Sequence, residues 1–247
     1  MHKNDRSVEE LEENLTPEER ESQAACLWIE RMITGGCPIG HAPRTVYTRY
    51  AKRAIDLIAG TVCLLALAPV IAGAWLLVKL TSPGPGIFAQ PRVGQNGRIF
   101  HCCKLRSMYI DQDHRVDVSA IEANAKKGLL CKLENDPRVT AVGQILRRTS
   151  IDELPQLFNV VAGTMSLVGP RPLVPHMVAP FPATSAIRHE VAPGITGLWQ
   201  ISSRSDNTSM GGMIEDDLHY VSTISLATDL RILLLTLPAV FKGEGAH

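Results

Sequence analysis

The sequence predicts a helix-rich α+β fold, in which a re-entrant membrane helix hairpin precedes a domain with a small β-hairpin and interfacial amphipathic helices. Three observations lead to this prediction. Residues 57–78 form an apolar run without a single charged side chain. Residues 87–102 have the pattern of two short strands around Gln95-Asn96-Gly97, a typical hairpin signal. Segments near the start, middle and end of the chain combine helix-start signals with apolar faces.

Composition describes a folded protein, with 45% apolar and 20% charged residues in a chain of 247. The formal charge is −5 over residues 1–33 and +5 over residues 34–247. A mildly basic body suits anionic ligands or an anionic lipid surface. The charge is too weak and dispersed for nucleic-acid binding, and no nucleic-acid motif is found. The six cysteines contain no C-x-x-C pair, which favours reduced thiols facing the cytoplasm, and the polar, acidic first 25 residues predict no signal peptide.

Residues 7–33 are expected to be helical, because Ser7-x-x-Glu10 and Thr16-Pro17-Glu18-Glu19 are both capping boxes. The second helix should end near Ile33. Its expected apolar face consists of Ala24, Ala25, Leu27, Trp28, Met32 and Ile33. A helix that packs on the main body is the favoured interpretation, and a partner or regulatory surface is the alternative. Residues 34–48 are expected to be a linker.

The apolar run Leu57–Val78 is long enough to cross a bilayer core of about 30 Å as a helix. Basic residues flank both ends of the run, so the positive-inside rule gives it no orientation. Pro69 lies near its middle and should kink the helix. Every candidate reactive residue follows the run. We therefore expect a re-entrant helix that bends at Ala68-Pro69 and returns to the same face, with a kinked single span as the alternative. Asp56 is expected to pair with Lys52 or Arg53.

The next segments are expected to be short and exposed. Thr81–Gly86 should stop the helix, and the strands are placed at 87–90 and 98–102. Arg92, Lys104 and Arg106 would then lie on or beside the hairpin, facing either an anionic partner or water. Residues 109–128 are expected to be a mobile surface helix, and residues 135–140 a turn.

The stretch 147–155 combines two arginines, two adjacent carboxylates and a helix start. Ser150-x-x-Glu153 is a capping box, and a helix N-terminus with nearby guanidiniums favours anions. An ordinary helix start with solvated arginines is the alternative interpretation. The helix should bury the apolar side chains Leu154, Leu157, Phe158, Val160 and Val161. Further on, Pro170-Arg171-Pro172 should hold one guanidinium on a stiff backbone.

The remaining chain offers weaker signals. Residues 173–187 are proline-rich and expected to be a loop. Residues 191–200 should form a turn that leads into an apolar element with Trp199 in the core. Arg204 lies in a Ser-rich loop, and residues 215–220 form an acidic cluster typical of a solvated helix start. Residues 224–241 suit an interfacial or docked amphipathic helix.

Taken in order, these motifs make the chain resemble the bacterial sugar transferase family, the monotopic polyprenyl-phosphate phosphoglycosyl transferases, over about residues 49–247. The motifs that carry the resemblance are Lys52-Arg53-x-x-Asp56, the apolar run with Pro69, Ser82-Pro83-Gly84-Pro85, Phe88-x-Gln90-x-Arg92-Val93-Gly94, Lys104–Met108, Asn135–Arg138, Ser150–Gln156, Met165–Pro172, Pro193–Gly197 and Asp217-x-x-Tyr220. The resemblance says nothing about the acidic N-terminal extension. At the helix break, relatives often have Ser before Pro, whereas this chain has Ala68.

The resemblance implies an enzyme of the bacterial inner membrane, with its catalytic domain on the cytoplasmic face. It would transfer a sugar-1-phosphate from a UDP-sugar to undecaprenyl phosphate, release UMP, and so initiate the synthesis of exopolysaccharide or another surface glycan. UDP-glucose and UDP-galactose are the favoured donors. The implied organisation is an extension and linker at 1–48, a re-entrant helix at 49–82 and a catalytic domain at 83–247. Membrane phospholipids are expected contacts, and glycan-assembly proteins or a second copy of the chain are further candidate partners.

Asp152 is then implied as the nucleophile, and Glu153 as the second catalytic residue and the ligand of Mg²⁺. Arg147 is implied as a phosphate clamp. Further residues expected at the phosphate and substrate site are Arg171, Lys104, Arg106, Arg92, Arg204, Pro170, Pro172 and Asp217. A membrane-anchored, catalytically inactive scaffold or regulatory protein of a glycan assembly system is the alternative function.

Overall fold

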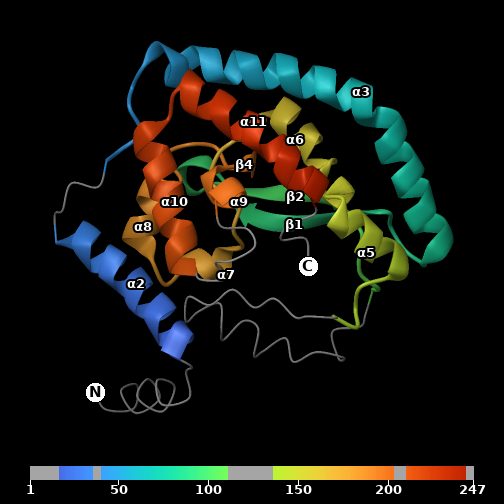
Figure 1. The fold of residues 1–247 in the computed structure, drawn as a ribbon, viewed down its shortest axis with the longest axis horizontal. Helices are drawn as coiled ribbons and strands as arrows, with labels where there is room; N and C mark the ends of the chain where they lie inside the picture. The colour runs from blue at the N-terminus through green and yellow to red at the C-terminus, as the bar shows by residue number, and fades with distance from the viewer. Residues whose placement is uncertain (1–16, 36–39, 111–135, 203–209, 243–247) are drawn as a thin grey trace.

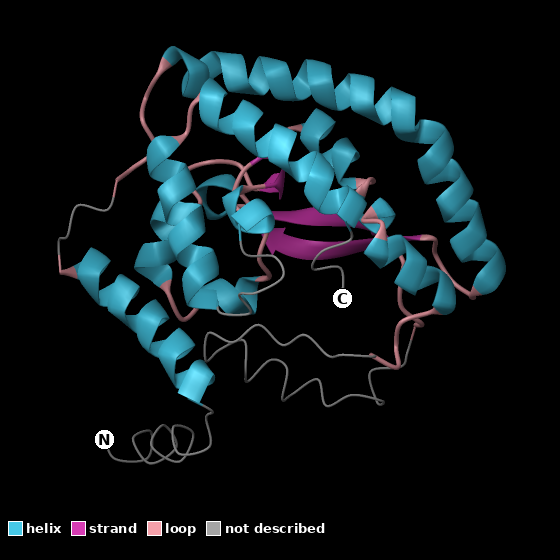
Figure 2. Cartoon of the chain, in the orientation of Figure 1, coloured by secondary structure: helices cyan, strands magenta, loops and turns pink. Residues whose placement is uncertain are grey.

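The computed structural model describes residues 17–35, 40–110, 136–202 and 210–242 (Figure 1). Figure 2 shows that helices dominate the fold and that the strands are few and short. The first half contains α2 (Pro17–Thr34), the π-helical turn η1 (Tyr47–Ala51), α3 (Lys52–Thr81), β1 (Ile87–Val93), η2 (Gln95–Gly97) and β2 (Ile99–Leu105). The second half contains α5 (Ala141–Arg148), η4 (Ile151–Glu153), α6 (Gln156–Ala162), β3 (Ser166–Val168), α7 (Pro175–Val178), α8 (Pro182–Arg188), β4 (Gly194–Thr196), α9 (Leu198–Ser202), α10 (Met210–Thr223) and α11 (Leu226–Lys242). The predicted helix-rich α+β class is confirmed.

Helix α3 is the longest element, and it bends so that its two halves arch around one side of the molecule (Figure 1). Pro69 lies inside it, and a proline removes one helix hydrogen bond and crowds the preceding turn. Together with η1 it is the one helix, among the described residues, that is long and apolar enough to cross a membrane. Only 11% of its most apolar window is buried. Its apolar side chains therefore face away from the other described residues and need a further cover.

Both ends of α3 are fixed to the same body. Near its start, Gly60 contacts Val160 of α6, and Arg53 donates hydrogen bonds to the carbonyls of Val160 and Val161. Near its end, Val78 packs with Leu105 of β2 and Leu146 of α5. A straight helix of this length would separate its ends by about 45 Å, so the bend is what allows both contacts.

The β-hairpin formed as expected, with β1 and β2 antiparallel and Ile87 opposite Leu105. Asn96 and Gly97 both adopt positive φ, at 55° and 73°. This geometry explains the strength of an Asn-Gly turn signal, since these two residues tolerate the left-handed region best. The strands are longer than predicted, at Ile87–Val93 and Ile99–Leu105.

A second, parallel pair joins β3 to β4, with Ser166 opposite Gly194. The sequence did not predict this pairing. The backbones of the two segments approach so closely that a Cβ on Gly194 would lie 2.1 Å from the Gly169 nitrogen. Glycine at position 194 is therefore required by the backbone packing.

The largest core lies between α2, α8, α9, α10 and α11, and its fully buried centre includes Met213, Tyr220, Val221 and Ile232. Helix α2 contributes Cys26 and Ile29 to it and packs against α8 and α10. The predicted start of α2 is confirmed and its packing matches the favoured interpretation. The predicted apolar face is only partly correct, because Ile33 packs against this core whereas Leu27 and Trp28 are exposed, Trp28 by 58%.

Three further expectations are corrected. The proline-rich segment 173–187 contains α7 and α8, each with Pro in its first turn, where proline costs no hydrogen bond. The acidic cluster at 215–220 is the middle of α10, and Tyr220 is completely buried there. Asp56 pairs with neither basic neighbour but accepts a hydrogen bond from the Leu167 amide at 3.0 Å. The turn after Asp136 is confirmed; residues 109–128 lie almost wholly outside the described residues.

The expected amphipathic helix near the C-terminus is α11, which meets the start of α3 through the ion pair between Asp229 and Lys52. It buries Asp229 and Ile232. Its exposed leucines are Leu226, Leu230, Leu234 and Leu235. Together with the outward face of α3, α11 gives this side of the molecule an apolar surface.

Candidate active site

The two adjacent carboxylates lie on η4, a short 3₁₀ turn between α5 and α6. Thr140 caps α5 by accepting a hydrogen bond from the Gly143 amide at 2.8 Å. Helix α5 packs on α3 and η4 packs on β2. Asp152 and Glu153 are therefore held between the hairpin and the second half of the long helix.

The predicted capping box at Ser150 is wrong. Ser150 adopts left-handed backbone angles, φ 55° and ψ 16°, and its side chain makes no cap hydrogen bond within the described part of the chain. The α-helix begins only at Gln156, since Pro155 has no amide hydrogen to continue the pattern. A non-glycine residue in this region stores backbone strain, and here the strain lies two residues before Asp152.

Helix α6 also differs from its predicted packing. It buries Leu157 and Val160, as expected, whereas Phe158 is 49% exposed. Leu154 and Val161 are half-buried. The 3₁₀ turn before α6 changes the rotation of the following helix, so the face expected from Ser150 onward does not match the observed one.

Asp152 is buried, with 7% of its surface exposed. Burial raises the pKa of its carboxyl from 3.8 to about 6, and the neighbouring Glu153 adds to the rise. The positive charges of Lys104 and Arg147 oppose this rise in pKa, because they favour the charged form of Asp152. Asp152 is therefore a carboxylate at neutral pH with little hydration, a state that suits a nucleophile.

Glu153 lies at the centre of a cluster of cations. The Lys104 Nζ is 2.7 Å from its Oε1, and the nearest Arg171 nitrogen is 3.8 Å from the same atom. Lys104 comes from β2, and Arg171 comes from the loop after β3. The structure thus brings together residues predicted from three separate motifs: Lys104, the pair Asp152 and Glu153, and Arg171.

Arg92 and Arg147 complete this cluster. Arg92 donates to the Pro172 carbonyl at 3.0 Å, and burial together with the nearby Arg171 lowers the pKa of Arg92 to about 10. The Nε of Arg147 donates to the Ser107 hydroxyl at 2.9 Å. The guanidiniums of Arg92 and Arg171 are thus held close together, and two like charges favour a bound anion between them. This arrangement therefore suits phosphate groups.

Different residues hold the side chain and the backbone of Arg171 in place. Its guanidinium lies over the Trp199 ring, 5.6 Å from the centroid, and Trp199 is buried as predicted. Its backbone carbonyl accepts a short hydrogen bond from Arg188, which also pairs with Asp217 at 2.6 Å. Pro170 stays next to β4, because its carbonyl accepts from the Gly194 amide at 2.9 Å.

Two residues expected at the substrate site lie elsewhere. Arg106 is buried and donates to the carbonyls of Ser82 and Pro83, so it holds the C-terminal end of α3. Asp217 has no exposed surface, and its carboxylate accepts two hydrogen bonds from Arg188. Neither side chain can reach a substrate in this arrangement. Arg204 lies outside the described residues.

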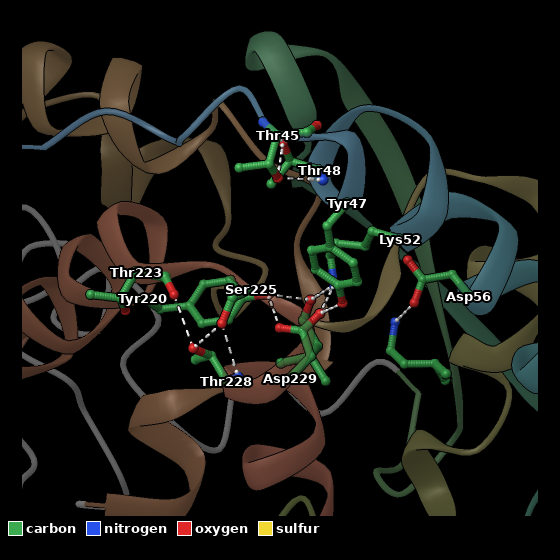
Figure 3. Close-up of polar contacts among 12 residues, drawn as sticks. Thr45, Tyr47, Thr48, Lys52, Asp56, Tyr220, Thr223, Ser225, Thr228 and Asp229 are labelled. Carbon is green, nitrogen blue, oxygen red and sulfur yellow. Dashed lines mark hydrogen bonds and ion pairs between the residues drawn. The ribbon is translucent and has the colours of Figure 1, made fainter.

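A buried polar network joins the start of α3 to α10 and α11 (Figure 3). The Lys52 Nζ is 2.6 Å from the Asp229 Oδ2 and 2.9 Å from the Val168 carbonyl. Tyr47 and Tyr220 both donate their hydroxyls to Asp229. Val168 ends β3 two residues before Pro170, so this network joins the apolar helix, α11 and the candidate site.

The sequence did not predict the roles of Asp229, Arg188 and Ser107, or the stacking partner of Arg171. Asp229 is the one acidic residue within the apolar segment 224–241, and that was the available signal for a buried ion pair. Nothing in the sequence marked Arg188, because it lies next to a segment predicted to be a loop.

The sequence is similar to those of known bacterial proteins. The family model described as bacterial sugar transferase matches residues 47–243. The chain is 43% identical over 197 residues to the galactosyl transferase CpsE of Streptococcus agalactiae serotype III, covering 79% of this chain and 43% of that protein. It is 39% identical over 204 residues to the exopolysaccharide production protein ExoY of Rhizobium meliloti, covering 80% of this chain and 88% of that one.

A third relative is the UDP-glucose:undecaprenyl-phosphate glucose-1-phosphate transferase of Escherichia coli K12, 41% identical over 216 residues. That match covers 83% of this chain and 43% of the relative. The chain therefore spans less than half the length of two of these three relatives and most of the length of the third. Helix α2 lies before the matched residues.

Proposed function

The chain belongs to the bacterial sugar transferase family, and on this premise we propose that it is an enzyme that transfers a sugar-1-phosphate from a UDP-sugar to undecaprenyl phosphate. The relatives' names include a galactosyl transferase and a glucose-1-phosphate transferase. The favoured donors are accordingly UDP-galactose and UDP-glucose. The product would start an exopolysaccharide or another surface glycan.

The observation that supports the proposal best is the buried, partly desolvated Asp152 among Lys104, Arg147 and Arg171. In the first step an Asp152 oxygen attacks the sugar-linked phosphorus of the donor. The bond from that phosphorus to the bridging oxygen breaks, and its electron pair leaves with UMP. In the second step an oxygen of undecaprenyl phosphate attacks the same phosphorus, and the Asp152 carboxylate is released.

The surrounding cations have a defined task in both steps. A carboxylate and a diphosphate repel each other, so attack requires positive charge near the phosphate oxygens. Arg171, from the loop after β3, lies 3.8 Å from Glu153, and Arg92, from β1, lies near Arg171. Lys104 neutralises Glu153 at 2.7 Å in this structure. A donor phosphate could share Lys104 and Arg171 with Glu153.

We propose Mg²⁺ as the cofactor, with Glu153 as its protein ligand. Among the described residues no group of three His, Cys, Asp or Glu side chains could hold a metal. Mg²⁺ commonly takes one or two carboxylates together with substrate phosphates and water, so Glu153 fits as the protein part of such a ligand set. When bound, the ion would supply positive charge to the donor phosphates.

We further propose that α3 is re-entrant in the inner membrane, with the catalytic domain on the cytoplasmic face. The bend, the exposed apolar surface and the attachment of both helix ends to one body support this topology. A polyprenyl phosphate keeps its chain in the bilayer and its phosphate at headgroup level. A helix that returns to its own face would hold Asp152 near that level.

Cysteine labelling tests this topology. In a variant lacking the native cysteines, Arg44→Cys and Arg98→Cys place exposed thiols before and after α3. Both should react with a membrane-impermeant maleimide only from the cytoplasmic side of sealed vesicles. Labelling of the two positions from opposite sides would mean that α3 crosses the membrane, and the re-entrant proposal would then be wrong.

The activity is tested by UMP release from purified protein with undecaprenyl phosphate, Mg²⁺ and a panel of UDP-sugars. Release with UDP-glucose or UDP-galactose, lost in the presence of a chelator, is expected. The same panel identifies the donor. An absence of release with every sugar would favour the inactive scaffold, since that alternative needs no chemistry at Asp152.

A further inference from the structure

Helix α8 receives its N-terminal cap from a residue on α2. The Glu30 carboxylate accepts hydrogen bonds from the amides of Ala183 and Thr184, at 2.8 and 2.9 Å, and from the Thr184 hydroxyl at 2.7 Å. Pro182 has no amide hydrogen, and α8 has no side-chain cap at its own N-cap residue, Phe181. Glu30 therefore satisfies both of the free amides in the first turn of α8.

The other end of α8 holds the backbone of the candidate site. Arg188 is the last residue of α8 and is almost completely buried. It donates to the Arg171 carbonyl and to the Asp217 carboxylate of α10. Burial raises the pKa of Asp217, while Arg188 and the backbone amide of Arg171 favour its charged form. The Arg171 backbone is thus held by an ion pair that α8 itself carries.

Helix α8 has only seven residues. A helix of this length is not stable alone in water, so its position depends on what fixes its ends. Helix α2 lies against both α8 and α10 and contributes Cys26 and Ile29 to their common core (Figure 1). One chain of contacts runs from Glu30 through α8 to Arg188, and from there to Arg171 beside Glu153.

From this chain of contacts we propose that α2, which lies outside the matched family residues, is a positioning element of the active site, and that Glu30 acts through α8 on Arg171. The inference rests on the proposed function for its kinetic readout but not for its structural one. Glu30 contacts no substrate in this role. It fixes α8, and α8 fixes the backbone from which Arg171 reaches the donor phosphates.

The experiment compares Glu30→Ala with wild type in the full-length protein. Hydrogen exchange should increase in peptides covering residues 181–188 and also in those covering residues 169–174, with helix α5 unchanged. The KM for the UDP-sugar should rise, with a loss of roughly 10-fold in kcat/KM, a modest effect for a misplaced positioning group. Combined with Arg171→Ala, the Glu30 substitution should add little further loss.

Two controls separate positioning from general destabilisation. Arg31→Ala changes an exposed neighbour on the same helix, and Ile29→Val removes one buried methyl group without touching the carboxylate. Both should leave exchange at 169–174 and the donor KM unchanged. The inference is overturned if Ile29→Val reproduces the effect, if the losses from Glu30→Ala and Arg171→Ala simply multiply, or if exchange rises only at 181–188. If wild type releases no UMP, the proposed function fails while the exchange comparison still decides the role of Glu30.

Discussion

Replacing Asp152 by Asn should abolish UMP release and at the same time make the folded protein more stable at neutral pH. The amide keeps the shape of the side chain but cannot attack phosphorus. Loss of a nucleophile leaves only the binding and electrostatic contributions of the site, and activities at least about 10³-fold lower are typical of such variants. No sugar-phosphate adduct should form on the variant when the acceptor is left out.

The stability gain follows from the pKa of Asp152. Its folded value of about 6 lies above the ordinary value of 3.8, so folding favours the protonated carboxyl. Between these two values the unfolded state loses its proton first, and stability falls as the pH rises. Above pH 6 the charged carboxylate costs up to about 3 kcal/mol. The uncharged amide of the Asp152→Asn variant would carry no such cost.

The measurement is thermal unfolding in detergent with a chelator, at pH 8 and near pH 4. The variant should unfold at a higher temperature than wild type at pH 8, and the difference should nearly vanish at the lower pH. Asp136→Asn provides a control of opposite sign. Hydrogen bonds from Arg138 lower the pKa of Asp136, so losing its charge should reduce stability at pH 8. Equal unfolding temperatures for wild type and Asp152→Asn at pH 8 would argue against a strained, desolvated nucleophile.

Local sequence patterns predicted the structure well where they have only one structural solution. The Asn-Gly turn requires positive φ at both residues. The run at 57–78 carries no charged side chain and is long enough for a single apolar helix, which is what α3 is. The Ser150 pattern failed because S-x-x-E also fits a 3₁₀ turn, and the turn that follows Ser150 here, η4, packs against both α5 and β2. The cap on α8 was not predictable, since its donors and acceptor are separated by about 150 residues.

The same limitation applies to Asp229, whose substitution should have the largest effect on stability. In Asp229→Ala, Lys52 would remain buried without its counter-charge, and Tyr47 and Tyr220 would lose their common acceptor. Removing one partner of a buried ion pair typically costs about 3–5 kcal/mol. We expect Asp229→Ala, Asp229→Leu and Lys52→Met each to lower the unfolding temperature strongly, as measured by thermal unfolding in detergent.

The double variant Lys52→Met/Asp229→Leu separates the two tasks of this ion pair. Apolar side chains of similar volume can replace a buried pair at little cost, so the double variant should recover most of the stability that either single variant loses. Turnover should not recover, because the Lys52 contact to the Val168 carbonyl fixes β3 next to Pro170 and Arg171. If the double variant recovered both stability and turnover, the Lys52–Asp229 ion pair would merely fill the core. If the losses of stability from the two substitutions were strictly additive, Lys52 and Asp229 would not be coupled. Recovered stability with impaired turnover would show that the two charges hold α3 in place against the loop that carries Arg171.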